Sequence, residues 1–254
     1  MQRIALTTWS VHPYLTDGTL PLAELPARAR AAGIGTLEIC HFHITDTTAT
    51  GIAALRQAAA HAGVEIFSIL VDAYDISQAD DTLREHDINQ IALWIDRAAA
   101  LGASHVRVVG GEAPADDAAA LRRSITALTR LSEHGRARGV VVMTENFKTL
   151  ASTPANWLAI HAALGHGGCA DIGNFPGTTR VADFAQVIGQ AASVHVKASY
   201  HDDGSIDPAQ VEACLAAAKA AGFAGPTTLV YDRPGDRWQG IAVLHDVVTR
   251  AFAH

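Results

Sequence analysis

Hydrophobic residues in this chain gather in short runs that alternate with longer amphipathic segments. Most of the runs are almost continuously apolar, which is typical of parallel strands covered on both faces. Helical segments lie between them; in one, the apolar residues Ile88, Ile91 and Ile95 recur at the spacing of a helix face. The strands are predicted at about residues 3–8, 35–40, 64–70, 104–109, 140–145, 168–172, 193–197 and 227–231.

A glycine separates many of the helical segments from the strand that follows. Glycine just past a helix readily adopts the left-handed conformation that closes the last turn. No linker or low-complexity tract interrupts the alternation. Eight strand–helix units therefore predict a (β/α)8 TIM barrel that forms a single domain over residues 1–254. The glycines are Gly33, Gly63, Gly102, Gly139 and Gly222.

Three polar residues fall where consecutive predicted strands end. Glu145, Asp171 and His195 belong to the fifth, sixth and seventh strands. The active site of a TIM barrel lies at the C-terminal ends of its strands, so these side chains should converge. Two carboxylates and an imidazole suit one divalent metal ion, with Mn²⁺ or Mg²⁺ preferred and Co²⁺ or Zn²⁺ as further candidates.

Each of these residues also has a structural interpretation. Glu145 can pair with Lys197 in the mouth of the barrel. Asp171 can cap a turn at the two residues that follow it. A histidine within a strand is often a hydrogen-bonded core residue that binds no metal, so His195 alone would be weak evidence for a metal site. The three together favour a metal site.

Further candidates surround this group. Lys197 faces the same way as His195, because strand side chains repeat every two residues, and it can hold a substrate oxygen or pair with a carboxylate. Arg107 lies within an apolar strand and needs a partner, either a core carboxylate or a substrate oxygen. Trp9 is expected to form a pocket wall, and His41 to contact substrate.

Composition restricts the function classes. The chain has 19 basic and 26 acidic residues, a net charge of −7, with no basic stripe, which argues against a nucleic-acid partner. No apolar run approaches the roughly 18 residues that cross a bilayer, and the N-terminus lacks a signal-peptide pattern. The three separated cysteines, Cys40, Cys169 and Cys214, suggest reduced thiols. A cytoplasmic protein without a membrane partner is expected.

The ordered motifs resemble the xylose isomerase-like TIM barrels, the superfamily of sugar phosphate isomerases/epimerases that includes endonuclease IV. The motifs span the chain: "TTWS", "LEIC", "VRVVGG", "TENF", "DIGNF", "VHVKAS" and "VYDRPGD". The resemblance implies that Glu145, Asp171 and His195 bind one divalent ion, and that a glutamate on the eighth strand completes the set. Val230 stands at that position. Asp232 lies two residues further along with the same facing, and is a substrate-binding candidate.

The resemblance implies a metal-dependent isomerase or epimerase that acts on a sugar or polyol-like carbonyl compound through an enediolate. Glu145 and Lys197 are the catalytic candidates, and Trp9, His41, Arg107 and Asp232 the substrate-binding candidates. With Val230 in place of a second proton-transfer group, one-base chemistry is favoured, and a lyase or dehydratase is an alternative. A sugar-binding barrel without turnover is another. The expected partner is a small sugar-like molecule, and a homo-oligomer is compatible with the sequence.

Overall fold

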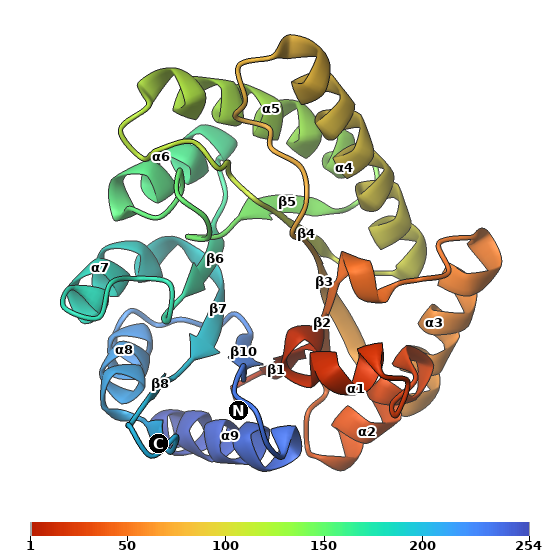
Figure 1. The fold of residues 1–254 in the computed structure, drawn as a ribbon, viewed down its shortest axis with the longest axis vertical. Coiled ribbons are helices and arrows are strands. Elements are labelled where there is room, and N and C mark those ends of the chain that lie inside the picture. The colour runs from red at the N-terminus through yellow and green to blue at the C-terminus, as the bar shows by residue number, and fades with distance from the viewer. Residues whose placement is uncertain (1, 254) are drawn as a thin grey trace.

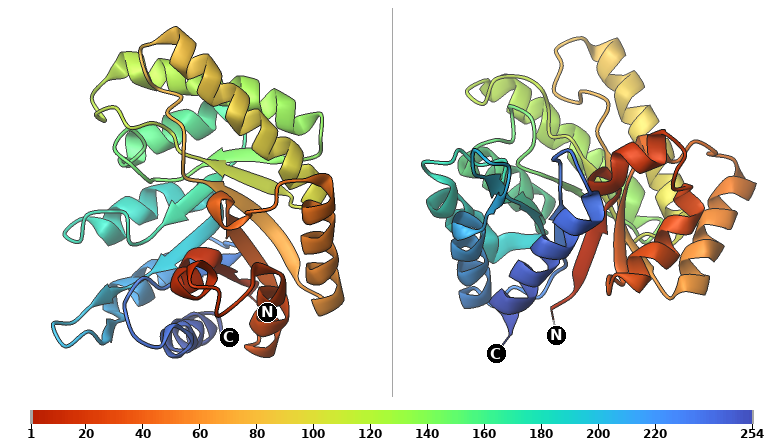
Figure 2. Two further views of the ribbon diagram at one scale, coloured as in Figure 1. Left: turned by 45° about the vertical axis from the view of Figure 1, so that its right-hand side comes forward. Right: turned by 60° about the horizontal axis from the view of Figure 1, so that its bottom comes forward.

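The computed structural model describes residues 2–253, which form a barrel of parallel strands surrounded by helices (Figure 1, Figure 2). The strands follow one another around the barrel in the order β5-β4-β3-β2-β1-β10-β7-β6. They are β1 (Ile4–Thr7), β2 (Thr36–Cys40), β3 (Glu65–Val71), β4 (His105–Val108), β5 (Val141–Thr144), β6 (Gly168–Asp171), β7 (Ala191–Lys197) and β10 (Thr227–Val230).

A parallel bridge between Glu145 and Cys169 joins the two ends of this order, β5 and β6. The barrel is therefore nearly closed, and the prediction of a single-domain TIM barrel is confirmed. All eight predicted strands are present, with ends within two residues of the expected positions. Figure 1 shows their ring around the barrel axis.

Helices form the outer layer and alternate with the strands along the chain. No helix within residues 2–253 is both long and apolar enough to cross a membrane. Within the described part of the chain, 3-10 helices lie at Thr8–Val11, Leu22–Glu24, His41–His43 and Ile188–Gln190. The α-helices are α1 (His12–Thr16), α2 (Leu25–Ala31), α3 (Ala49–Ala62), α4 (Asp81–Leu101), α5 (Ala118–Arg136), α6 (Pro154–Leu164), α7 (Arg180–Val187), α8 (Ala209–Ala220) and α9 (Arg237–Phe252).

The local signals read from the sequence act as expected. Gly63 and Gly102 end α3 and α4 with positive φ angles of 64° and 86°. Ile88, Ile91 and Ile95 of α4 are buried against the barrel. The three cysteines are buried and unpaired.

A two-stranded antiparallel hairpin was not predicted. Its strands, β8 (Ser199–Tyr200) and β9 (Ile206–Asp207), follow β7 and lie outside the barrel sheet. Each has two residues, and the polar connection between them turns at Gly204, where φ is 83°. Such short strands leave no hydrophobic period in the sequence, so pattern analysis cannot detect them.

Close packing between α6 and β6 fixes the strand that carries Asp171. Trp157 donates a hydrogen bond from Nε1 to the Cys169 carbonyl at 3.0 Å, and its ring lies 4.3 Å from that of His161. A Cβ atom at Gly168 would lie 2.0 Å from Nε2 of His161. Only glycine fits at the start of β6 beside this ring.

Burial of His161 predicts acid sensitivity. Burial lowers the pKa of His161 from the usual 6.5 to about 4, so between these values the unfolded chain binds a proton that the folded protein does not. The free energy of unfolding of the metal-free protein should therefore fall as the pH drops from about 6.5 to about 4, by roughly 3 kcal/mol from His161 alone.

This decline can be measured by urea unfolding at several pH values. The variant His161→Leu should flatten the dependence, because the titrating ring is gone. A decline in this window that is equally steep in His161→Leu would contradict the assignment of the proton uptake to His161.

Candidate active site

A cavity of about 310 Å³ opens at the C-terminal ends of the barrel strands. Six of the residues singled out in the sequence line it: Trp9, Arg107, Glu145, Asp171, His195 and Lys197. Val230, the apolar residue at the expected fourth-ligand position, lines it as well. His41 and Asp232 are not among the lining residues.

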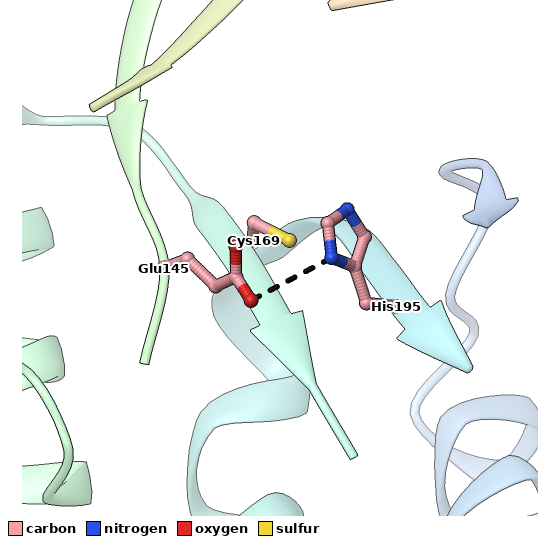
Figure 3. A group of neighbouring side chains, drawn as sticks. All are labelled: Glu145, Cys169 and His195. Carbon is pink, nitrogen blue, oxygen red and sulfur yellow. Dashed lines mark ion pairs between the residues drawn. The ribbon is translucent and has the colours of Figure 1, made fainter. Parts of the chain in front are cut away.

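His195 stands at the centre of the site with carboxylates on both sides of its ring. Its Nε2 lies 2.6 Å from Oε2 of Glu38. Its Nδ1 lies 3.6 Å from Oε1 of Glu145 and 3.8 Å from Oδ2 of Asp171. All four side chains are almost completely buried. Figure 3 shows the Glu145 carboxylate directed at the His195 ring, with Cys169 beside them.

The buried carboxylates around His195 determine the charge of its ring. Burial alone would lower the pKa of His195, but the acidic groups around it outweigh burial and raise the pKa well above 6.5. Without a metal ion, the imidazole is therefore held as a cation by its neighbours. The negative groups that hold the charge are the carboxylates of Glu38, Glu145 and Asp171, because the Cys169 thiol, with a pKa of about 11, is uncharged at neutral pH.

The buried Arg107 pairs with Glu145. Arg107 Nε lies 2.9 Å from Oε2 of Glu145, and its Nη1 donates to Oδ1 of Asp72 at 2.5 Å. The contact with Glu145 is an ion pair without hydrogen-bond geometry. Burial raises the pKa of Glu145, but the charges of Arg107 and His195 outweigh burial and lower the pKa to about 2. Glu145 is thus a carboxylate at neutral pH.

Asp171 has two separate tasks, one for each oxygen. Oδ1 accepts backbone N–H groups from Gly173 at 2.6 Å and Asn174 at 3.1 Å, so the predicted turn cap exists. Oδ2 remains on the His195 side. The Asn146 side chain holds the Asp171 backbone with hydrogen bonds of 2.7 and 2.9 Å. Burial raises the pKa of Asp171.

Lys197 pairs with Asp232 rather than with Glu145. The Nζ–Oδ2 distance is 3.0 Å, and the Tyr200 hydroxyl donates to the other Asp232 oxygen at 3.3 Å. Burial lowers the pKa of Lys197, but the charges of Asp171 and Asp232 raise it above its usual value. Lys197 is therefore an ammonium ion at the cavity wall, in register with Val230 on β10.

Aromatic residues form the rim. Trp9 and Phe42 are 40% and 41% exposed and meet edge to face with ring centroids 6.3 Å apart. His41 faces away from the centre, and its Nδ1 lies 3.3 Å from both the Leu70 carbonyl oxygen and the Asp72 amide nitrogen. His41 thus contacts the end of β3, and its contact with substrate stays a prediction.

The donor set fits a divalent cation on the Nδ1 side of His195. Two carboxylate oxygens converge there. Nε2 is hydrogen-bonded to Glu38, and metal-binding histidines commonly donate their second N–H to a carboxylate in this way. Glu145, Cys169 and His195 form another group, with ligand atoms within 4.8 Å of one another. Burial raises the pKa of Cys169 to about 11, and this residue does not line the cavity. Asp171 does, and therefore suits an ion that substrate can reach.

Glu38 was missed in the sequence. It lies on β2 within "TLEIC", where every residue is buried. A glutamate inside an otherwise apolar strand was the available signal, because a buried carboxylate requires a partner.

Similarity to solved structures agrees with the barrel fold. An L-ribulose 3-epimerase is 18% identical with a TM-score of 0.77, over 99% of this chain and 96% of that chain. A D-allulose 3-epimerase from Methylomonas sp., in complex with D-allulose, is 14% identical with a TM-score of 0.76, over 99% and 97%. A xylose isomerase-like TIM barrel protein from Mycobacterium smegmatis, in complex with magnesium, is 18% identical with a TM-score of 0.70, over 100% and 98%.

No curated protein matches the sequence. The family model for the xylose isomerase-like TIM barrel matches residues 26–245, which include β2 to β10 and every candidate site residue except Trp9. Eight parallel strands, the cavity at their C-terminal ends and this match agree with one another. The chain belongs to the xylose isomerase-like TIM barrel family.

Proposed function

We propose that this chain is a divalent-metal-dependent enzyme that isomerises or epimerises a sugar or polyol-like carbonyl compound through an enediolate. The observation that carries the proposal is the convergence of Glu145 and Asp171 on Nδ1 of His195, at the floor of an open cavity. The epimerases of L-ribulose and D-allulose among the similar structures support a sugar as substrate.

Glu145, Asp171 and His195 would hold the ion, with Mn²⁺ or Mg²⁺ preferred because two of the three ligands are carboxylates. When bound, the ion would polarise the substrate carbonyl and offset the negative charge of the enediolate. Arg107 pairs with Oε2 of Glu145, and Asn174 donates from Nδ2 to Oε1 at 2.9 Å, so Oε1 is held on the His195 side of the cavity in a fixed orientation.

Proton transfer would involve Glu145 and Lys197. Glu145 is ionised and can accept the proton from the carbon next to the carbonyl, although a pKa of about 2 makes it a weak base. Lys197 has three N–H donors, one of them directed to Asp232, and can donate to a substrate oxygen. Trp9 would cover the substrate at the rim, while Asp232 orients Lys197.

Val230 shapes the choice of reaction. Its aliphatic side chain can neither accept a proton nor bind metal, although it lines the cavity. A proton removed by Glu145 would therefore return on the same face of the substrate, as in aldose–ketose isomerisation. The same residues also suit a lyase, in which Glu145 removes the proton and Lys197 protonates the departing hydroxyl to release water.

Product analysis in D₂O separates these reactions. Metal-loaded protein would be incubated with ketoses such as L-ribulose and D-allulose. An isomerase or epimerase gives sugars that differ from the substrate in composition only by exchange of hydrogen for deuterium, whereas a lyase gives a product that has lost water. Metal binding without turnover of a broad panel of ketoses, polyol-derived ketones and sugar acids would favour a binding protein.

The first prediction concerns Glu145→Gln. Loss of one anionic ligand should weaken Mn²⁺ binding by about tenfold or more and abolish turnover. Arg107 keeps Asp72 as a partner, so the metal-free protein should remain folded and lose about 2–3 kcal/mol of stability. Calorimetry with Mn²⁺ and urea unfolding measure the two effects.

Glu112→Gln provides the matched control. Glu112 pairs with Lys148 at the exposed rim, with 3.2 Å between Oε1 and Nζ, so removing its charge should leave Mn²⁺ affinity unchanged. Equal affinity in Glu145→Gln and the unsubstituted protein would rule Glu145 out as a ligand.

The second prediction concerns Val230→Glu. A carboxylate at this position would point into the same cavity and should tighten Mn²⁺ binding by about tenfold or more, because affinity rises with the number of charged ligands. Val230→Gln has the same shape without the charge and should bind Mn²⁺ more weakly than Val230→Glu. If both variants bind as the unsubstituted protein does, the ion lies beyond the reach of position 230.

A further inference from the structure

Glu38 is a buried carboxylate that no lysine or arginine contacts within residues 2–253. Its side chain is 0% exposed on β2, and its salt-bridge partner is His195. Placing a carboxylate in the barrel interior costs free energy, and an apolar residue of similar size often stabilises a fold better than a buried ion pair does. The presence of Glu38 is therefore better explained by its effect on His195 than by stability.

Both oxygens of Glu38 are engaged by neighbouring strands. Oε2 meets Nε2 of His195 on β7 at 2.6 Å, and Oε1 accepts the Thr228 hydroxyl of β10 at 3.1 Å. Thr228 and His195 are themselves paired in register. The carboxylate is thus fixed at both ends and cannot turn without losing a bond.

The pairing between β2 and β3 is irregular at the level of Glu38, with the extra residue in β3. Leu37 pairs with Ile66 on β3, but Glu38 pairs with Ser68, so the pairing skips Phe67. Such irregularities bend a strand and re-aim its side chains, and they are frequent beside active sites. The register shift begins at Glu38 itself, between Leu37 and Glu38.

We infer that Glu38 is a positioning residue that reserves Nδ1 of His195 for the metal ion. By accepting a hydrogen bond from Nε2–H, Glu38 fixes the ring orientation and the tautomer with which His195 binds metal. The free lone pair then lies on the Nδ1 side, toward Glu145 and Asp171. This inference rests on the proposed metal-dependent function and adds the residue that orients its nitrogen ligand.

The test combines two variants of Glu38 with one control. Glu38→Gln keeps the shape and removes the charge, and it should weaken Mn²⁺ binding by about 10–100-fold in calorimetry, the usual effect of losing a partner of a metal-binding histidine. Thr228→Val removes the bond to the other oxygen and should cause a smaller loss in the same direction. The control is Glu65→Gln: Glu65 lies on β3 and forms an exposed ion pair with Arg3, so this variant should bind Mn²⁺ as the unsubstituted protein does.

A second readout does not need metal. In chelator-treated protein, the short bond between His195 and Glu38 should give a strongly deshielded Nε2 proton resonance in the NMR spectrum. The signal should persist in Glu65→Gln and disappear in Glu38→Leu. If this signal is absent from the unsubstituted protein, Glu38 does not hold the ring and the inference is wrong.

The outcomes separate this inference from the function on which it rests. If the unsubstituted protein binds no divalent metal, the proposed function and this inference both fail. If it binds Mn²⁺ and folded Glu38→Gln binds equally well, only the positioning role is overturned. If Glu38→Gln does not fold, a loss of affinity in Thr228→Val supports the role and unchanged affinity in that variant contradicts it.

Discussion

The site depends on one buried imidazole that has carboxylates next to both of its ring nitrogens. Glu38 meets one nitrogen of His195, while Glu145 and Asp171 converge on the other. Three negative groups gathered around a single ring in a low-dielectric interior would repel one another strongly without positive charge among them. In the metal-free protein the protonated ring supplies that charge. A divalent ion on the Nδ1 side would supply more of it, and would leave the bond to Glu38 intact.

The barrel makes this arrangement rigid by drawing each group from a different strand. Glu38, Glu145, Asp171 and His195 come from β2, the end of β5, β6 and β7, and the bridge between Glu145 and Cys169 joins the strands where the sheet closes. Contacts behind the site fix the side chains further. Arg107 connects Glu145 to Asp72, and the turn after β6 uses one oxygen of Asp171. The other oxygen of each carboxylate lies on the His195 side, where that of Glu145 also accepts a hydrogen bond from Asn174 Nδ2 at 2.9 Å.

Much of this could be predicted from the sequence, because a parallel barrel imposes strong local patterns. Continuous apolar runs and helix-ending glycines marked all eight strands, and the rule that barrel sites lie at strand ends brought Glu145, Asp171 and His195 together. The partners of these residues could not be derived. Arg107 and Lys197 each needed a partner, and whether Glu145 met one or the other depends on side-chain directions that spacing does not specify. Glu38 was overlooked because it is far from the other residues in sequence, 157 positions before His195. The hairpin of β8 and β9 was also missed, because two-residue strands carry no period.

We propose that a divalent ion lies between Glu145, Asp171 and Nδ1 of His195. Crystals of the protein grown with Mn²⁺ and measured near the manganese absorption edge test this claim most directly, because anomalous scattering locates the ion independently of the protein atoms. We expect one strong anomalous peak at bonding distance from these three side chains, with Nε2 of His195 still hydrogen-bonded to Glu38. A peak bound instead through Cys169, or no peak in the cavity while His195 keeps a proton on Nδ1, would contradict it.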